Sequence, residues 1–299
     1  MEAELNYLSE TTPNYASPAA SGGYQSEGPS AKPPSIGKVD VCVPSLEALP
    51  EKLVRNIEET IPVNRLLTVI GLPRGPARQN LIDRVETEFF VFVDSDVVIY
   101  PWWFEDASSL VGPKVGAVEG RPVGYGDPRI NELNAAMDGI GVRLGRGHFL
   151  DRVERAFTGA TLIRTDAVKG IRIPNTIWYE DEYIRRHIES RGYSWLRSRR
   201  PDYWHWGRKG ARLQEMYESA VCAYNLGFMK PGTEIRRLLY KTPIKALYVL
   251  RSTGDPSVAS ILVRRQIART RGLLHAKVQA DEAPGDRRGV LSRSRPKGM

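Results

Sequence analysis

Strand-like and helix-like segments alternate along the first third of the chain, and this alternation limits the fold more than any other feature. Short continuous apolar runs at 38–44, 65–71 and 88–96 predict buried strands, and the segments 49–61 and 76–86 between them predict helices. This order is typical of βαβ units, whose strands are parallel. Continuous apolar runs also fit strands that are covered on both faces. We therefore expect an α/β protein with a mostly parallel sheet flanked by helices.

The two ends of the chain differ from its middle in composition and charge. Residues 1–37 are rich in Ser, Pro, Gly and Ala and poor in large aliphatic side chains, which predicts a disordered tail, and 281–299 predicts a second one. Between them we expect the α/β domain at 38–230 and a basic helical extension at 231–280. The net charge of +8 is concentrated in this C-terminal part, so the main domain is not expected to bind nucleic acid.

Signals for the cellular compartment are few. Cys42 and Cys222 lie far apart and have neither the spacing of a disulfide framework nor that of a zinc site. The first residues lack the pattern of a signal peptide, and no apolar run reaches the roughly 20 residues that span a bilayer. We expect a cytoplasmic protein, either free or peripheral on the cytosolic face of a membrane. Segment 231–280 could pack on the domain, lie on an anionic membrane surface, or bind a polyanion.

Two aspartates, Asp94 and Asp96, follow the third predicted strand. Ligands of open α/β sheets bind beyond the carboxyl ends of the strands. Two carboxylates this close repel each other unless a cation or several hydrogen bonds stabilise the ionised pair. A divalent cation would do so and would also clamp a diphosphate. The alternative is a solvated turn in which Asp94 caps the following segment.

Two classes of enzyme carry such a DxD pair after an apolar strand. In haloacid-dehalogenase-like phosphatases the first aspartate is the nucleophile, and the string DSDVV fits that pattern. In nucleotide-sugar glycosyltransferases of the GT-A fold, the pair holds the metal that binds the donor. The phosphatase motif normally lies on the first strand, whereas two strand–helix units precede it here. The late acidic pair Glu180 and Asp181 opens a helix and does not follow a strand, so the position of both motifs favours the transferase.

Over roughly residues 38–210 the chain resembles family 2 glycosyltransferases. Segment 75–101 is similar to the family's block in which an Arg/Asn helix precedes the DxD strand and a proline. Segment 157–168 is similar to its glycine-bearing acceptor-side segment, and 179–193 to its Glu-Asp helix ending in Gly-Tyr. His205 stands where the family often has a late metal ligand. The resemblance implies a GT-A fold and metal-dependent, inverting transfer of a sugar from a nucleotide diphosphate.

The resemblance also implies roles for single residues. Asp181 would be the general base that deprotonates the acceptor hydroxyl, with Glu180 positioning it or the acceptor. Asp96 and His205 would ligate Mn²⁺ or Mg²⁺. An inverting transfer needs one such base and neutralisation of charge on the leaving diphosphate. The residues implied to lie around the nucleotide sugar are Pro44, Glu47, Arg78, Asn80, Asp94, Ser95 and Gly159.

Several of these residues also have a purely structural interpretation. His205 could pack between Trp204 and Trp206, and Glu180 and Asp181 could only favour the start of a helix through its dipole. The alternative functions are a DxD phosphatase, and a non-catalytic protein that binds a sugar nucleotide or a polyanion. For the transferase, the expected partners are a nucleotide-diphosphate sugar and a glycan or lipid-linked acceptor, whose hydroxyl or phosphate receives the sugar.

Overall fold

The structure is a computed structural model that describes residues 36–122, 128–143, 156–205 and 213–282. The two predicted tails, 1–37 and 281–299, therefore lie almost entirely outside the described residues.

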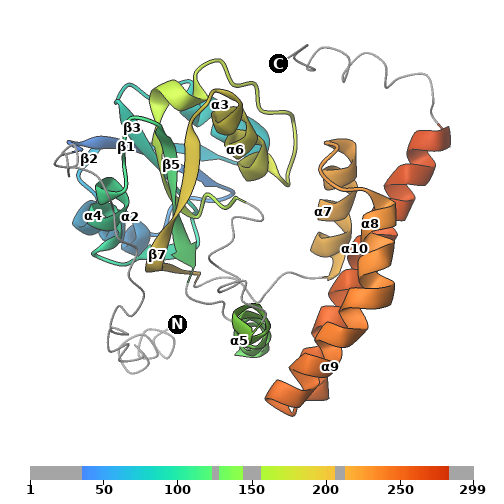
Figure 1. Cartoon of the computed structure of the whole chain (residues 1–299). Helices are drawn as coiled ribbons and strands as arrows, with labels where there is room; N and C mark the ends of the chain where they lie inside the picture. Colours follow the sequence, from blue (N-terminus) through green and yellow to red (C-terminus); the bar gives the residue numbers. More distant parts are fainter. Residues whose placement is uncertain (1–35, 123–127, 144–155, 206–212, 283–299) are drawn as a thin grey trace. The chain divides into compact units, whose positions relative to one another are not determined.

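Seven strands in the described part of the chain form one mixed sheet with the order β2-β1-β3-β6-β5-β7-β4 (Figure 1). β1 is parallel to β2 and β3, and β5 is parallel to β7. β6 runs antiparallel to both β3 and β5, so five strands share one direction, and only β6 and β4 oppose it. This confirms the predicted α/β class and mostly parallel sheet. The strands are β1 (Val39–Ser45), β2 (Val63–Ile70), β3 (Phe89–Val93), β4 (Val97–Ile99), β5 (Val115–Pro122), β6 (Ala160–Arg164) and β7 (Ser194–His205).

Helices cover both faces of the sheet. Helices α2 (Glu51–Thr60) and α4 (Trp103–Ser109) lie on one side, and α3 (Arg74–Ile82) and α6 (Glu180–Ser190) lie on the other (Figure 1). Alternate strand residues therefore enter different clusters, because successive side chains of a strand point to opposite faces. All five residues of β3 are buried, which explains its continuous apolar run.

The C-terminal part is helical, as predicted, and begins earlier than residue 231. The helix α7 (Leu213–Asn225) packs closely on α10 (Pro256–Glu282). Gly272 permits this close approach, since a Cβ added there would lie 2.3 Å from the carbonyl oxygen of Tyr217. Between them in sequence are α8 (Pro231–Arg236), the π-helical turn η3 (Arg237–Lys241) and α9 (Thr242–Thr253). The predicted domain boundary at 230 stays a prediction, and α7, which precedes it, packs on α10.

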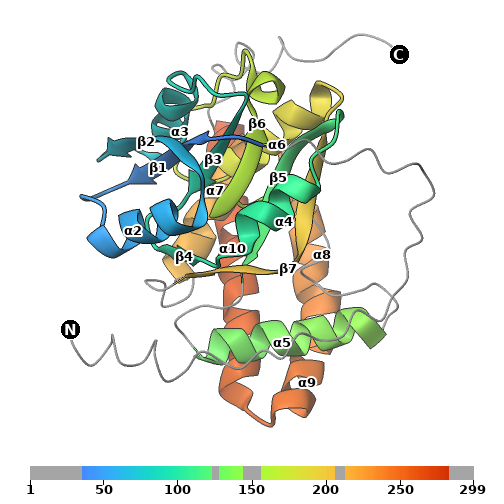
Figure 2. The ribbon, with the colours of Figure 1, turned by 90° about the vertical axis from the view of Figure 1, so that its left-hand side faces the viewer.

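A third apolar cluster joins these helices to α5 (Pro128–Arg143), which runs across them in Figure 2. Its buried members are Leu133, Ala136, Val249, Val258 and Ala259. In the ranges that the structure describes, no helix combines the length and the apolar character that a membrane crossing requires.

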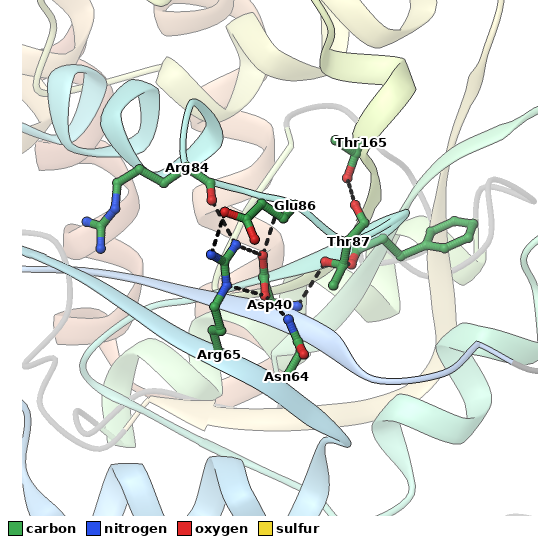
Figure 3. A network of polar contacts seen from close by, with 8 residues as sticks. Asp40, Asn64, Arg65, Arg84, Glu86, Thr87 and Thr165 are labelled. Atoms are coloured by element: carbon green, nitrogen blue, oxygen red, sulfur yellow. Dashed lines mark hydrogen bonds and ion pairs between the residues drawn. The ribbon is translucent and has the colours of Figure 1, made fainter.

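The buried carboxylate of Asp40 ties β1 to β2 and to the turn before β3 (Figure 3). It accepts hydrogen bonds from Asn64 Nδ2 (2.9 Å), from Arg65 Nη2 (2.6 Å) and from the backbone N–H of Glu86 (2.9 Å). Burial alone would raise the pKa of Asp40, but the hydrogen bonds from these three partners lower it to about 2. Asp40 therefore stabilises the folded chain as a carboxylate.

We expect Asp40→Asn to lower the free energy of unfolding by about 1–2 kcal/mol at pH 7, because Arg65 loses its charged acceptor. The folded-state pKa lies below the ordinary value of 3.8, so this contribution is complete above pH 4 and is lost as the pH falls towards 2. Urea denaturation of both proteins between pH 7 and pH 3 measures the difference. Asp83→Asn, at an exposed acid, is the control and should change stability by less than about 0.5 kcal/mol.

Candidate functional site

The carboxyl ends of β1 and β3 lie side by side and carry the first site residues. The pairing of β1 with β3 extends to Cys42 and Phe92, two residues before Pro44 and Asp94. The backbone N–H of Asp94 donates to the carbonyl of Gly159 (2.9 Å), at the start of β6. Asp94 and Gly159 therefore lie side by side, and Ser95 follows Asp94 directly in the chain. The roles of Pro44, Asp94, Ser95 and Gly159 at a nucleotide sugar stay predictions.

Gly159 leaves room for a side chain from another strand. A Cβ added there would lie 2.7 Å from the hydroxyl oxygen of Tyr203, whose side chain is fully buried. Tyr203 in turn packs edge-on against His205, with the ring centroids 5.3 Å apart. The glycine therefore lets the end of β7 approach the DxD segment.

Asp96 and His205 meet because β4 pairs antiparallel with β7. Val97 is the register partner of His205, and Asp96 Oδ1 lies 3.4 Å from His205 Nδ1. His205 is buried, whereas about a third of the Asp96 side chain (35%) is exposed. One face of this pair therefore remains open to a ligand.

The donor set of this pair fits a divalent cation that also binds substrate. Among the residues described, no group of three or more His, Cys, Asp and Glu side chains is arranged to hold a metal by itself. Mg²⁺ in particular is commonly held by one or two carboxylates together with phosphate oxygens and water. Asp96 and His205 could hold Mn²⁺ or Mg²⁺ in this manner, with the remaining positions left for a diphosphate.

Arg78 links the DxD segment to the start of α6. Its side chain is only 4% exposed, its Nη2 lies 2.9 Å from Asp94 Oδ1, and its Nη1 donates to Glu180 Oε1. Burial alone would lower the pKa of Arg78, but the negative charges of Glu180, Asp94 and Asp181 outweigh it and raise the pKa above its ordinary value. Arg78 is therefore a fixed cation among three carboxylates.

Glu180 and Asp181 begin α6 and are both buried. Burial raises the pKa of Glu180, as does the charge of Asp181, while Arg78 opposes this rise. Asp181 Oδ1 accepts the backbone N–H of Glu182 (2.8 Å), and Glu180 Oε2 is buried without a hydrogen-bond partner in the described part. A role limited to the helix dipole would not require such burial, which costs free energy. Their position therefore favours a functional interpretation.

The residue before this pair has a strained backbone. Tyr179 has φ +67°, and among the described residues it is the only non-glycine with positive φ. Its ring packs near Phe228 (centroids 5.9 Å apart), and its hydroxyl donates to Met229 Sδ at 3.8 Å. Strain of this kind is often found at functional sites and persists only where the surroundings hold it. No signal in the sequence indicates this turn, because tyrosine rarely adopts that conformation.

Two predicted residues lie outside the cluster. Glu47 is exposed beyond β1, where its backbone N–H donates to Ser45 Oγ (3.3 Å). Asn80 is exposed on α3, and its side-chain carbonyl accepts from Arg84 (3.5 Å). Residues two apart on a helix do not face the same way, so Asn80 points away from Arg78. Their roles at a nucleotide stay predictions that rest on the resemblance.

Arg74 lies close to Glu180, although no motif of the sequence includes it. Its guanidinium lies over the ring of Trp178, 5.1 Å from the centroid, and its charge lowers the pKa of Glu180. The signal was the spacing, because Arg74 and Arg78 are four residues apart and so share one face of a helix. Arg74 is exposed and therefore available to an anionic ligand.

Comparisons with known proteins find distant structural likeness and no related sequence. No family model matches the sequence, and no curated protein matches it. A mannosyltransferase from Pyrobaculum calidifontis, solved with GDP-Man and Mn²⁺, aligns with a TM-score of 0.49 and 14% identity over 85% of this chain and 89% of that one. Glucosyl-3-phosphoglycerate synthase from Mycobacterium tuberculosis, solved with Mn²⁺, UDP and phosphoglyceric acid, aligns with a TM-score of 0.43 and 14% identity over 65% and 80%. Likeness at this level assigns no family to the chain and no role to any of its side chains.

Proposed function

We propose that the chain is a GT-A glycosyltransferase that moves a sugar, with inversion, from a nucleotide diphosphate to an acceptor hydroxyl or a lipid phosphate. The observation that carries this proposal is the Arg78 bridge, which joins the DxD segment at Asp94 to the buried Glu180 and Asp181. A transferase needs donor-side and acceptor-side carboxylates at one site. The bridge supplies a physical link between the two.

On the donor side, Asp96 and His205 would hold Mn²⁺ or Mg²⁺ together with the diphosphate. The bound cation would neutralise charge on the leaving diphosphate. Asp94, which directly follows β3, would contact the nucleotide ribose. Arg74, at the exposed start of α3, lies over Trp178 and lowers the pKa of Glu180, so its positive charge would act near the start of α6.

On the acceptor side, Asp181 would take the proton of the acceptor hydroxyl. As that oxygen bonds to the anomeric carbon, the bond from this carbon to the diphosphate oxygen breaks, and the configuration inverts. This single displacement needs one base and no covalent nucleophile. Glu180, paired with Arg78, would keep the first turn of α6 in place and so position Asp181.

The phosphatase alternative is less well supported. It requires Asp94 as a nucleophile, but Asp94 Oδ1 is paired with Arg78 at 2.9 Å. It also requires a late acidic pair directly after a strand, whereas Glu180 and Asp181 begin a helix.

A thermal-shift screen of UDP-, GDP- and dTDP-sugars with and without Mn²⁺ tests the proposal. One donor should stabilise the protein only when Mn²⁺ is present, by about 2.7 kcal/mol at a donor concentration 100 times Kd. Asp96→Asn should remove this metal-dependent shift, because it takes away one of the two protein ligands. Glu105→Gln, at an exposed acid in α4, should keep it.

The other functions give different results in the same samples. Hydrolysis of an aryl phosphate that depends on Asp94 would show a phosphatase. A donor-induced shift without turnover on any acceptor would show a binding protein. Stabilisation by a donor that is equal with and without Mn²⁺ would contradict the metal-dependent site.

A further inference from the structure

Large apolar side chains are exposed on η3 and α9. Leu239, Tyr240, Ile244 and Leu247 are 61%, 68%, 71% and 68% exposed, and Leu250 adds a further 38%. We call these five residues the α9 face. Single exposed apolar residues are ordinary, but a contiguous group of them marks a surface that contacts something else.

Helical geometry places this face opposite the packed side of α9. Thr242 and Val249 are buried and seven residues apart, and Val249 belongs to the cluster with α5 and α10. Tyr240, Ile244 and Leu247 follow one another at spacings of four and three, so they share a second face of the helix. A helix on the surface of a globular protein is normally polar on its outer side. α9 instead presents Ile244 and Leu247 on its outer side, with Arg251 following them in the last turn.

The charged residues in the sequence segment that carries the α9 face are all basic. Between Glu234 and Asp255 the sequence holds no acidic residue and five basic ones, at 236, 237, 241, 245 and 251. Arg236, Lys241 and Arg251 are exposed. Apolar side chains bordered by Lys and Arg are typical of helices that lie in the headgroup region of anionic bilayers.

We propose that the α9 face docks on the surface of a bilayer that contains anionic phospholipid. The apolar side chains would enter the boundary between headgroups and acyl chains, while Arg236, Lys241 and Arg251 would contact lipid phosphates. A second copy of the chain fits less well, because a two-fold contact through this face would bring like charges together. The proposal does not depend on the transferase activity, and its test uses no substrate.

Co-sedimentation of the full chain with vesicles tests the proposal. Binding should be strong to phosphatidylcholine vesicles that contain about one third phosphatidylglycerol, weak to pure phosphatidylcholine, and reduced by salt. The double change Ile244→Glu and Leu247→Glu should lower the partition coefficient at least about tenfold. Val278→Glu together with Ile267→Glu is the matched control, since both are exposed apolar residues of α10 outside the face and the charge change is the same.

The outcomes separate the proposal from its alternatives. Loss of binding in the α9 variant alone supports the proposal. Equal loss of binding in both double variants would show that only the added negative charge matters, which would overturn the proposal. The proposal would also be overturned if the original chain bound neither kind of vesicle. Sedimentation velocity without vesicles covers the remaining case, because a dimer that Ile244→Glu disrupts would assign the face to a second copy.

Discussion

Asp181→Asn is expected to lower the rate of sugar transfer by about a thousandfold while leaving metal-dependent donor binding intact, because the amide cannot accept a proton and general-base catalysis contributes on this scale. The substitution keeps the shape of the side chain, and its carbonyl can still accept the backbone N–H of Glu182. Turnover with the donor identified by thermal shift measures the first effect. The size of that donor's shift measures the second.

A neighbouring acid of the same helix controls for charge. Glu189→Gln changes an exposed carboxylate in the last turn of α6 and should leave both transfer and donor binding unchanged. If Asp181→Asn weakens donor binding as much as transfer, Asp181 belongs to the donor side. If it turns over like the original protein, Asp181 is not the base.

Arg78→Met is expected to lower the free energy of unfolding by about 3–5 kcal/mol, because it removes the cation that two carboxylates share at a buried position. Glu180 would be left in the interior without its partner. The loss should shrink at lower pH, because the pKa of Glu180 is already raised and protonation removes the unpaired charge. Urea denaturation at pH 7 and pH 5 measures both effects.

Companion variants keep this prediction testable even where Arg78→Met does not fold. Arg78→Lys keeps the charge but loses the forked geometry that reaches two acceptors. Its free energy of unfolding should therefore lie between that of the original protein and that of Arg78→Met. Adding Glu180→Gln to Arg78→Met should recover part of the loss. Arg84→Met, at an exposed arginine just after α3, should cost less than about 1 kcal/mol. A similar loss for Arg78→Met and Arg84→Met would contradict the bridge.

The parts of the fold that were predicted are those with a strong local pattern. β3 was expected because its residues form one apolar run, and all five are buried. α6 was expected to begin at the acidic pair and to end before Gly192, which has φ +83° as the residue after a helix often does. β4 and β7 were not expected. β4 has only three residues, and β7 includes the charged Arg197, which pairs with Glu119 on β5.

The sequence by itself determined the α/β class, the helical C-terminal part and the chemical types present at the carboxyl end of β3, because helix and strand periods and motif spacing are local properties. The tertiary structure alone decided that Arg78 lies between Asp94 and Glu180, which is 102 residues away from it. It also decided which side of α9 is buried. Periodicity shows which residues share a helix face, but when both faces are apolar only the packing of neighbouring helices determines which one is left for a partner.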